Sequence, residues 1–394
     1  MEAARAKVAQ EVRFDINASN QAEVNAKAYR AIARSFVSDT VTVPTPEMYQ
    51  YAMLGSLGDD VFHEPHTQAL EAHLAKITGK EAALYVSSGT QSNQLALRAH
   101  LTQPPHSVLM DIRAHVNVHE GGGLAYHCGA ATVAITPTNG HHITLDEVKK
   151  HIILDNQLGH AAVTRVIELE NTLNGTIFPQ DEIVAISDFA HSKGVLMHLD
   201  GARLWHVAAE TGKSLTELCA PFDSVNMCFS KGLGAPIGSI LAGPKDFIAR
   251  ARVLRKLFGG GMRQTGFLAA AAAYALTNNF PRLPAVHKLA QKLEAGLEAL
   301  GVTITSRAET CMVFFSCEGL GFDASEVVKR AEALPDPITL FGERLVVHIQ
   351  TSEEAVDDLL ALFKALIEEK RAAGLANGVA TNGSATSASP YVKA

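Results

Sequence analysis

The sequence is poor in positive charge and in long apolar runs, and each shortage excludes a class of protein. Its 394 residues contain 34 Lys and Arg against 41 Asp and Glu, a formal net charge of −7, and no basic run that could follow a phosphate backbone. The longest apolar stretch, residues 266–276, has about half the length that a bilayer span needs. We therefore expect neither a nucleic-acid partner nor a membrane span.

Cysteine is also scarce, with five residues and no Cys-x-x-Cys pair. Such a set in a long chain is typical of small buried apolar side chains, so we predict neither disulfides nor a metal site. The first ten residues include Glu2, Arg5 and Lys7 and lead into no apolar segment of the kind that secretory signals contain. The predicted location is cytoplasmic.

What is present is the composition of a folded protein, with 47% hydrophobic and 19% charged residues. Along the middle of the chain, short apolar and β-branched runs alternate with longer segments of helical periodicity. These runs span residues 82–86, 107–110, 131–136, 165–170, 195–200, 224–230 and 238–243. Because several are apolar on both faces, they predict an α/β domain with one large, mainly parallel sheet.

The pattern changes near both ends of the chain, which predicts four parts. Amphipathic segments over residues 1–35 predict a helical N-terminal arm, and residues 36–280 form the predicted large domain. Residues 281–371 mix helical and strand-like segments, which predicts a smaller C-terminal α+β domain. Small and polar residues dominate 372–394, where we predict a disordered tail.

Two charged residues follow predicted strands at positions where α/β proteins bind ligands. Lys231 comes after the run 224–230 and before Gly232, and a lysine there can form an imine with a carbonyl cofactor. Asp200 ends the run 195–200, and an aspartate that keeps a pyridine nitrogen protonated is what pyridoxal phosphate enzymes need. Taken singly, Lys231 could be a surface residue and Asp200 a helix cap. As a pair they predict pyridoxal 5'-phosphate as the cofactor.

Two further segments are suited to a phosphate group. Ser88, Gly89 and Thr90 lie where the run 82–86 passes into a predicted helix, so that backbone N–H groups and the positive helix end can face an anion. Farther along, Lys256 and Arg263 flank three consecutive glycines that permit a close backbone approach. The second segment could equally be a flexible junction with solvated charges.

Together these segments resemble the threonine aldolase family of fold-type I pyridoxal phosphate enzymes, within the wider β-eliminating lyase group. The likeness covers roughly residues 36 to 350, with its matches in the same order along the chain. They are Ser38-Asp39-Thr40, Gly58-Asp59-Asp60-Val61-Phe62, Gly79-Lys80-Glu81-Ala82, Arg113-Ala114-His115, the segment 169–175 (Leu-Glu-Asn-Thr-Leu-Asn-Gly) and Gly261-Met262-Arg263-Gln264. The resemblance implies an aspartate aminotransferase-like fold, an amino acid substrate and a homodimer or homotetramer with shared active sites.

The resemblance also implies roles for the cofactor-binding residues. Lys231 would hold the cofactor covalently as an imine, Asp200 would pair with the pyridine nitrogen, and His115 would stack on the ring. The phosphate would be bound by Ser88, Gly89 and Thr90, with Lys256 and Arg263 reaching it from a neighbouring subunit.

For the substrate, the resemblance implies that Arg203, Ser38 and Arg344 grip the carboxylate, since a guanidinium fork matches its two oxygens. His160 would lie near the substrate hydroxyl. Plain alternatives exist for three of these residues: His160 could cap a loop, Arg344 could be a solvated strand residue and Ser38 could cap a turn.

The sequence departs from the family pattern at positions expected around the substrate. The segment 62–67 reads Phe-His-Glu-Pro-His-Thr where many members have Tyr-Gly-x-Asp-Pro-Thr, Leu173 stands in place of a histidine, and Val37 in place of an arginine. These changes leave two reactions open, and the resemblance favours retro-aldol cleavage of L-threonine and L-allo-threonine to glycine and acetaldehyde, with racemisation of an amino acid such as alanine as the alternative. A catalytically silent homologue is a third possibility, against which the intact pair of Lys231 and Asp200 argues.

Overall fold

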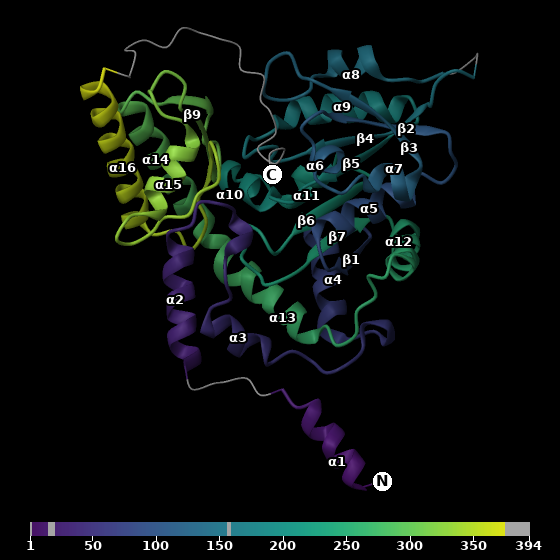
Figure 1. The fold of residues 1–394 in the computed structure, drawn as a ribbon. Coiled ribbons are helices and arrows are strands. Elements are labelled where there is room, and N and C mark those ends of the chain that lie inside the picture. Colours follow the sequence, from purple (N-terminus) through teal and green to yellow (C-terminus); the bar gives the residue numbers. More distant parts are fainter. Residues whose placement is uncertain (1, 15–19, 156–158, 375–394) are drawn as a thin grey trace.

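The structure, a computed structural model, describes residues 2–14, 20–155 and 159–374. A seven-stranded sheet occupies one side of the molecule and a smaller three-stranded sheet the other (Figure 1). The large sheet consists of β1 (Ala82–Val86), β2 (His106–Asp111), β3 (Ala130–Ile135), β4 (Thr164–Glu170), β5 (Leu196–Asp200), β6 (Ser224–Cys228) and β7 (Ser239–Gly243). All seven strands coincide within one or two residues with the runs that the sequence predicted.

The strand order of the large sheet is β1-β7-β6-β5-β4-β2-β3. Neighbouring strands from β3 to β6 are parallel, whereas β7 runs antiparallel to both β6 and β1. The prediction of an α/β fold with one mainly parallel sheet is therefore confirmed.

Helices cover both faces of this sheet, which is why its strands are apolar on both sides. On one face pack α4 (Pro65–Thr78), α8 (Leu145–His151), α9 (Gln180–Ser192) and α11 (Leu215–Cys219). On the other pack α5 (Gly89–His100), α7 (Gly123–Cys128) and α12 (Lys245–Leu257). Four further helices connect these elements: α3 (Pro46–Ala52), α6 (His115–Val118), α10 (Leu204–Thr211) and α13 (Gly266–Tyr274).

The smaller sheet has the order β10-β9-β8 and is antiparallel throughout. It comprises β8 (Thr303–Ser306), β9 (Met312–Ser316) and β10 (Arg344–Val346), with α14 (Leu283–Ala299), α15 (Ala324–Glu332) and α16 (Glu353–Ala372) beside it. Strand β8 was not predicted, because it is short and largely exposed and so lacks an apolar pattern. The α+β character of this part agrees with the sequence.

Within the described residues, the predicted N-terminal arm contains two helices, α1 (Glu2–Glu11) and α2 (Gln21–Ala33), as the sequence predicted. Arg30 of α2 donates two hydrogen bonds to Asp336, at 3.0 and 2.9 Å, so α2 packs on the part that carries the smaller sheet. The division of the chain at residues 35, 280 and 371 stays a prediction, and most of the predicted tail lies outside the described residues.

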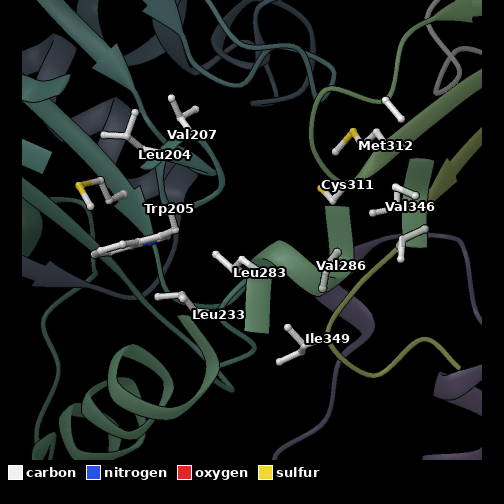
Figure 2. Close-up of a cluster of buried hydrophobic side chains, with 14 of the residues drawn as sticks. Leu204, Trp205, Val207, Leu233, Leu283, Val286, Cys311, Met312, Val346 and Ile349 are labelled. Atoms are coloured by element: carbon white, nitrogen blue, oxygen red, sulfur yellow. The ribbon is translucent and has the colours of Figure 1, made fainter. Parts of the chain in front are cut away.

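One hydrophobic core joins the two sheets. Figure 2 shows Leu204 and Trp205 of α10 facing Leu283 and Val286 of α14, with Met312 and Val346 of the smaller sheet beyond them. All of these side chains are buried. Because α10 begins directly after β5, this core fixes the smaller sheet close to the carboxyl edge of the large one.

The five cysteines, all within the described residues, are unpaired and buried, as predicted. Across the same part of the chain, no helix combines the length and apolar character that crossing a membrane requires.

Strand β4 carries a carboxyl group into the interior. Glu168 is 1% exposed and lies opposite His198 of β5 in the register of the sheet. Neither of its oxygens has a hydrogen-bond partner among the described residues. Burial, reinforced by the nearby charge of Asp200, raises the pKa of Glu168 well above its ordinary value of 4.5.

Replacing Glu168 with Gln should therefore stabilise the chain at pH 8 and do little near pH 5. A raised pKa means that the stabilising contribution of Glu168 is complete below pH 4.5 and is lost as the pH rises. Each pH unit over which only the folded chain keeps this proton costs the native state about 1.4 kcal/mol. Thermal unfolding midpoints of the two proteins, measured at pH 5 and pH 8, should diverge with pH. The exposed Glu318→Gln serves as a control, and a Glu168→Gln difference that is the same at both pH values would contradict the prediction.

Candidate active site

The carboxyl ends of β5 and β6 bring Asp200 and Lys231 to one edge of the large sheet. Asp200 is the last residue of β5 and lies opposite Asn226 of β6. Lys231 follows the end of β6 at Cys228 by three positions, in a turn closed by a hydrogen bond from the Gly234 N–H to the Lys231 carbonyl at 2.8 Å. This edge is where open α/β sheets bind ligands.

Asp200 is a buried carboxylate with several donors around it. It accepts hydrogen bonds from Asn93 Nδ2 at 2.7 Å, from Asn226 Nδ2 at 2.9 Å and from the backbone N–H two residues on at 3.0 Å. Burial by itself would raise the pKa of Asp200, but the charges of Lys231 and His115 and the Asn93 hydrogen bond together lower it below its ordinary value. The site therefore holds an ionised carboxylate out of water.

His115 starts the short helix α6 and is held at two points. Its backbone N–H donates to Glu170 Oε2 at 2.8 Å, and its side-chain Nδ1 lies 2.9 Å from Glu120 Oε1. Burial would lower the pKa of His115, but the hydrogen bond to Glu120 and the charge of Asp200 outweigh burial and raise it. Burial and the Asp200 charge also raise the pKa of Glu170 to about 7. His115, with its raised pKa, and Glu170, which titrates near neutrality, thus lie close to Asp200.

The turn at Ser88, Gly89 and Thr90 forms the amino end of the 12-residue helix α5. Ser88 caps this helix by accepting a hydrogen bond from the backbone N–H of Gln91 at 3.1 Å. A Cβ at Gly89 would come within 2.7 Å of the Cys228 sulfur, so glycine is what allows this end of α5 to approach β6. The positive end of α5 can face an anion here.

The two cations of the glycine-rich segment lie on the surface. Lys256 is near the end of α12 and is exposed, and Arg263 is exposed and donates to Asp59 Oδ2 at 3.1 Å. A side chain at Gly260 would collide with Gln91, so this segment packs against the first turn of α5. Gly260 thus lies against Gln91, whereas both cations stay exposed.

Arg203 is engaged by a partner that the sequence analysis did not assign. Its Nε and Nη2 donate to the two carboxylate oxygens of Asp39 at 2.7 and 2.6 Å. Burial would raise the pKa of Asp39, but the charge and hydrogen bonds of Arg203 hold it well below its ordinary value. The guanidinium fork that we expected on the substrate is therefore occupied within the protein.

The other two residues expected on the substrate carboxylate lie close together. Ser38 accepts a hydrogen bond from the backbone N–H two residues on at 3.2 Å, so the turn-capping alternative holds for it. Arg344 begins β10 and donates to the Val37 carbonyl at 3.0 Å. Burial, the neighbouring His115 and Arg344 together lower the pKa of His119, whose ring centroid is 5.5 Å from that of His115. Arg344 thus faces the edge that holds His115.

His160 does not join this group within one chain. It is exposed and precedes β4, whereas Asp200 and Lys231 lie at the carboxyl ends of the strands. The seven residues of β4 span about 20 Å, which separates His160 from the other residues. The expectation that it lies near the substrate hydroxyl is therefore not met by this chain's own fold.

The positions that depart from the family pattern divide into two groups within one chain. Phe62 is 79% exposed, and His66 accepts a hydrogen bond from the Ser56 N–H at 2.9 Å, so both belong to a surface segment beside Arg263. Leu173, by contrast, is buried three positions beyond β4, on the carboxyl side of the sheet.

Besides Asp39, the sequence analysis missed Asn93, Glu120 and Asn226 as parts of the site. A signal existed for two of them, because Asn93 follows the phosphate turn by one helical turn and Glu120 follows His115 by five residues. Which charged group each would contact could not be read from spacing.

Among the residues that the structure describes, two sets of side chains have ligand atoms within 4.8 Å of one another and so could hold a metal ion: Asp39, His206 and Cys311, and His115, Glu120 and Asp200. In both sets the carboxylates already accept hydrogen bonds from protein donors. The sequence-based prediction of no metal site is unchanged.

Known proteins resemble this chain in sequence and in fold. A model of the beta-eliminating lyase family matches residues 35–318. A probable low-specificity L-threonine aldolase from Schizosaccharomyces pombe is 43% identical over 353 residues, 89% of this chain and 91% of that protein. The alanine racemase TOXG from Cochliobolus carbonum is 34% identical over 342 residues, 84% of this chain and 87% of that protein. The structure of a threonine aldolase from Leishmania major superposes with a TM-score of 0.72 over 84% of this chain and 99% of that one, at 22% identity. The chain therefore belongs to the beta-eliminating lyase family.

Proposed function

We propose that this chain cleaves L-threonine and L-allo-threonine into glycine and acetaldehyde, using pyridoxal 5'-phosphate. The observation that carries the proposal is the meeting of Lys231, Asp200 and His115 at the carboxyl edge of the sheet. Family membership and the 43% identity to the S. pombe protein support the reaction class.

The residues present fit this cofactor. Asp200 is an ionised carboxylate held by two amides, as a protonated pyridine nitrogen requires, and the amino end of α5 at Ser88, Gly89 and Thr90 suits a phosphate. Lys231 would hold the cofactor covalently. When bound, pyridoxal phosphate supplies the electron sink for the charge that develops at the substrate Cα.

For the substrate carboxylate we propose Arg344 together with Ser38. The Arg203 guanidinium is already hydrogen-bonded to both oxygens of Asp39. Arg203 would therefore contribute a fixed positive charge near the substrate carboxylate, without binding both substrate oxygens itself. The smaller sheet thus supplies one substrate contact through Arg344, and the segment before α3 supplies the other through Ser38.

For the proton of the β-hydroxyl we propose His115 as the base. Glu120 accepts from its Nδ1, which leaves Nε2 with the lone pair. A raised pKa makes this imidazole a stronger base than a solvated one. A part for His160 would require that it reach the site of another subunit.

The alternative reaction is racemisation of alanine, which the 34% identity to the alanine racemase TOXG supports. Racemisation needs proton donors on both faces of the substrate Cα, and Lys231 and His115 are the candidates. The two reactions share the same cofactor and lysine, so only their products tell them apart.

The first test is product analysis. The purified protein should convert L-threonine and L-allo-threonine to glycine and acetaldehyde, and L-alanine to little or no D-alanine. Borohydride reduction should attach the cofactor to Lys231, where mass spectrometry locates it, and Lys231→Ala should abolish turnover while leaving the fold intact. Rapid D-alanine formation without glycine would instead favour the racemase.

We also propose that the active unit is at least a homodimer with shared sites, either a dimer or a tetramer. Lys256 and Arg263 are exposed, and several large apolar side chains around them are exposed as well: Met53, Leu57, Phe62 and Leu257. Apolar side chains gathered in this way mark interaction surfaces. A second copy would cover them and bring the two cations to a phosphate site. The cytoplasmic location remains a prediction from the sequence.

Subunit mixing tests the shared site. Lys231→Ala and Arg263→Ala should each be inactive or strongly impaired as homo-oligomers, while a mixture should regain up to about a quarter of the parent sites, because one composite site then carries both defects and another carries neither. Exchange of subunits is checked independently with differently tagged chains. Exchange without any return of activity would argue for sites built from a single chain.

A further inference from the structure

We propose that Asn93 and Glu120 form a polar bridge that fixes His115 and Asp200 relative to each other, so that the base and the partner of the pyridine nitrogen are positioned as one unit. The inference rests on the proposed function for the roles of His115 and Asp200. The bridge itself consists of hydrogen bonds among buried side chains of this chain.

Asn93 is the centre of the bridge. It is 1% exposed on α5, and its Nδ2 donates to Asp200 Oδ2 at 2.7 Å and to Glu120 Oε1 at 2.9 Å. Because carboxylates only accept, the amide group must turn its two N–H bonds toward them and its oxygen toward His198 Nε2, which lies 3.1 Å away. Both protons of one amide group are thus used to join two carboxylates.

Glu120 ties the other end of the bridge to the histidine. Its side chain is fully buried and accepts from His115 Nδ1 at 2.9 Å and from Gln94 Nε2 at 2.5 Å, in addition to Asn93. Three hydrogen-bond donors replace the hydration of the Glu120 carboxylate, and this offsets the free-energy cost of removing it from water.

The local backbone is built to bring Glu120 to α5. Gly121 and Gly122 directly after it have φ of 62° and 74°, a left-handed conformation that other residues avoid. A side chain at Gly123 would collide with Gln94. The chain therefore reverses at once behind Glu120 and presses α7 against α5.

The bridge determines what His115 can do. Since Glu120 accepts the hydrogen bond from the Nδ1–H of His115, Nε2 is left as the acceptor, and the ring is held in one plane. Other charged or titratable groups also face His115 from the surrounding elements: Asp200 of β5, Glu170 of β4, Lys231 after β6, and His119 after α6, which Arg344 of β10 approaches. The His115 imidazole donates its hydrogen bond to a further group, Glu120.

The test combines Glu120→Gln, which removes the charge at constant shape, with Asn93→Ser, whose single hydroxyl proton cannot serve two carboxylates. The first readout is the affinity of the apoenzyme for pyridoxal phosphate, measured by absorbance without substrate. Each single variant should bind several-fold more weakly, and the double variant should lose at least about threefold less than the product of the two single losses, as expected for members of one network. Effects that simply multiply would overturn the bridge.

The second readout is the pH dependence of kcat/KM. Glu120→Gln should shift the acid limb of the kcat/KM profile to lower pH by about one unit, because the His115 imidazole loses its anionic partner. Glu120→Asp, which keeps the charge, should largely restore the parent profile. Gln94→Met is the matched control, since Gln94 also donates to Glu120 but makes no hydrogen bond to Asp200. It should leave the coupling between positions 93 and 120 in place.

The outcomes separate this inference from the proposed function. Coupled cofactor affinities in a protein that does not cleave threonine would uphold the bridge and reject the aldolase. If Asn93→Ser does not fold, as judged by circular dichroism, the acid limb of Glu120→Gln decides, and an unmoved limb would overturn the inference.

Discussion

The burial of the Asp200 carboxylate is the constraint on which the rest of the site depends. Moving a carboxylate out of water costs several kcal/mol unless charges and hydrogen bonds replace its hydration. Here the amides of Asn93 and Asn226 supply the hydrogen bonds, while Lys231 and His115 supply positive charge. One amide comes from α5 and the other from β6, so the position of both elements is bound to this one side chain.

The topology of the large sheet explains why Lys231 lies near the Asp200 carboxylate. A parallel connection must leave the carboxyl edge and cross the sheet, usually through a helix. Because β7 runs antiparallel to β6, the chain between them stays at the edge as a short turn, and Lys231 stays with it. The single reversal of direction at β7 thus places Lys231 beside the end of β5.

Charge in this protein is divided between a buried set and an exposed set. Asp39 with Arg203, and Glu120 with His115, are hydrogen-bonded pairs in which the carboxylate is buried and its partner is partly buried. Lys256 is exposed, and Arg263 is 64% exposed beside Asp59, so neither is fixed by the interior of its own chain. Exposed cations next to exposed apolar side chains are suited to an interface with a second copy of the chain. The hydrogen-bonded pairs, by contrast, are suited to a site whose geometry one chain maintains by itself.

The order of strands and helices was determined by the sequence itself, because alternating apolar runs and helical periodicity depend on neighbouring residues. The pair of Lys231 and Asp200 could be predicted for the same reason, since Asp200 ends one strand, Lys231 closely follows another, and parallel strands end at one edge. Short and exposed β8 was not readable, because it carries no apolar pattern. Only the tertiary structure decided that Arg203 is hydrogen-bonded to Asp39 and that Asn93 joins Glu120 to Asp200. It also decided that, within one chain, His160 lies at the opposite edge of the sheet from Lys231. Such contacts join residues far apart in the sequence, and which polar groups meet is set by how the helices pack on the sheet and by the need to satisfy every buried charge.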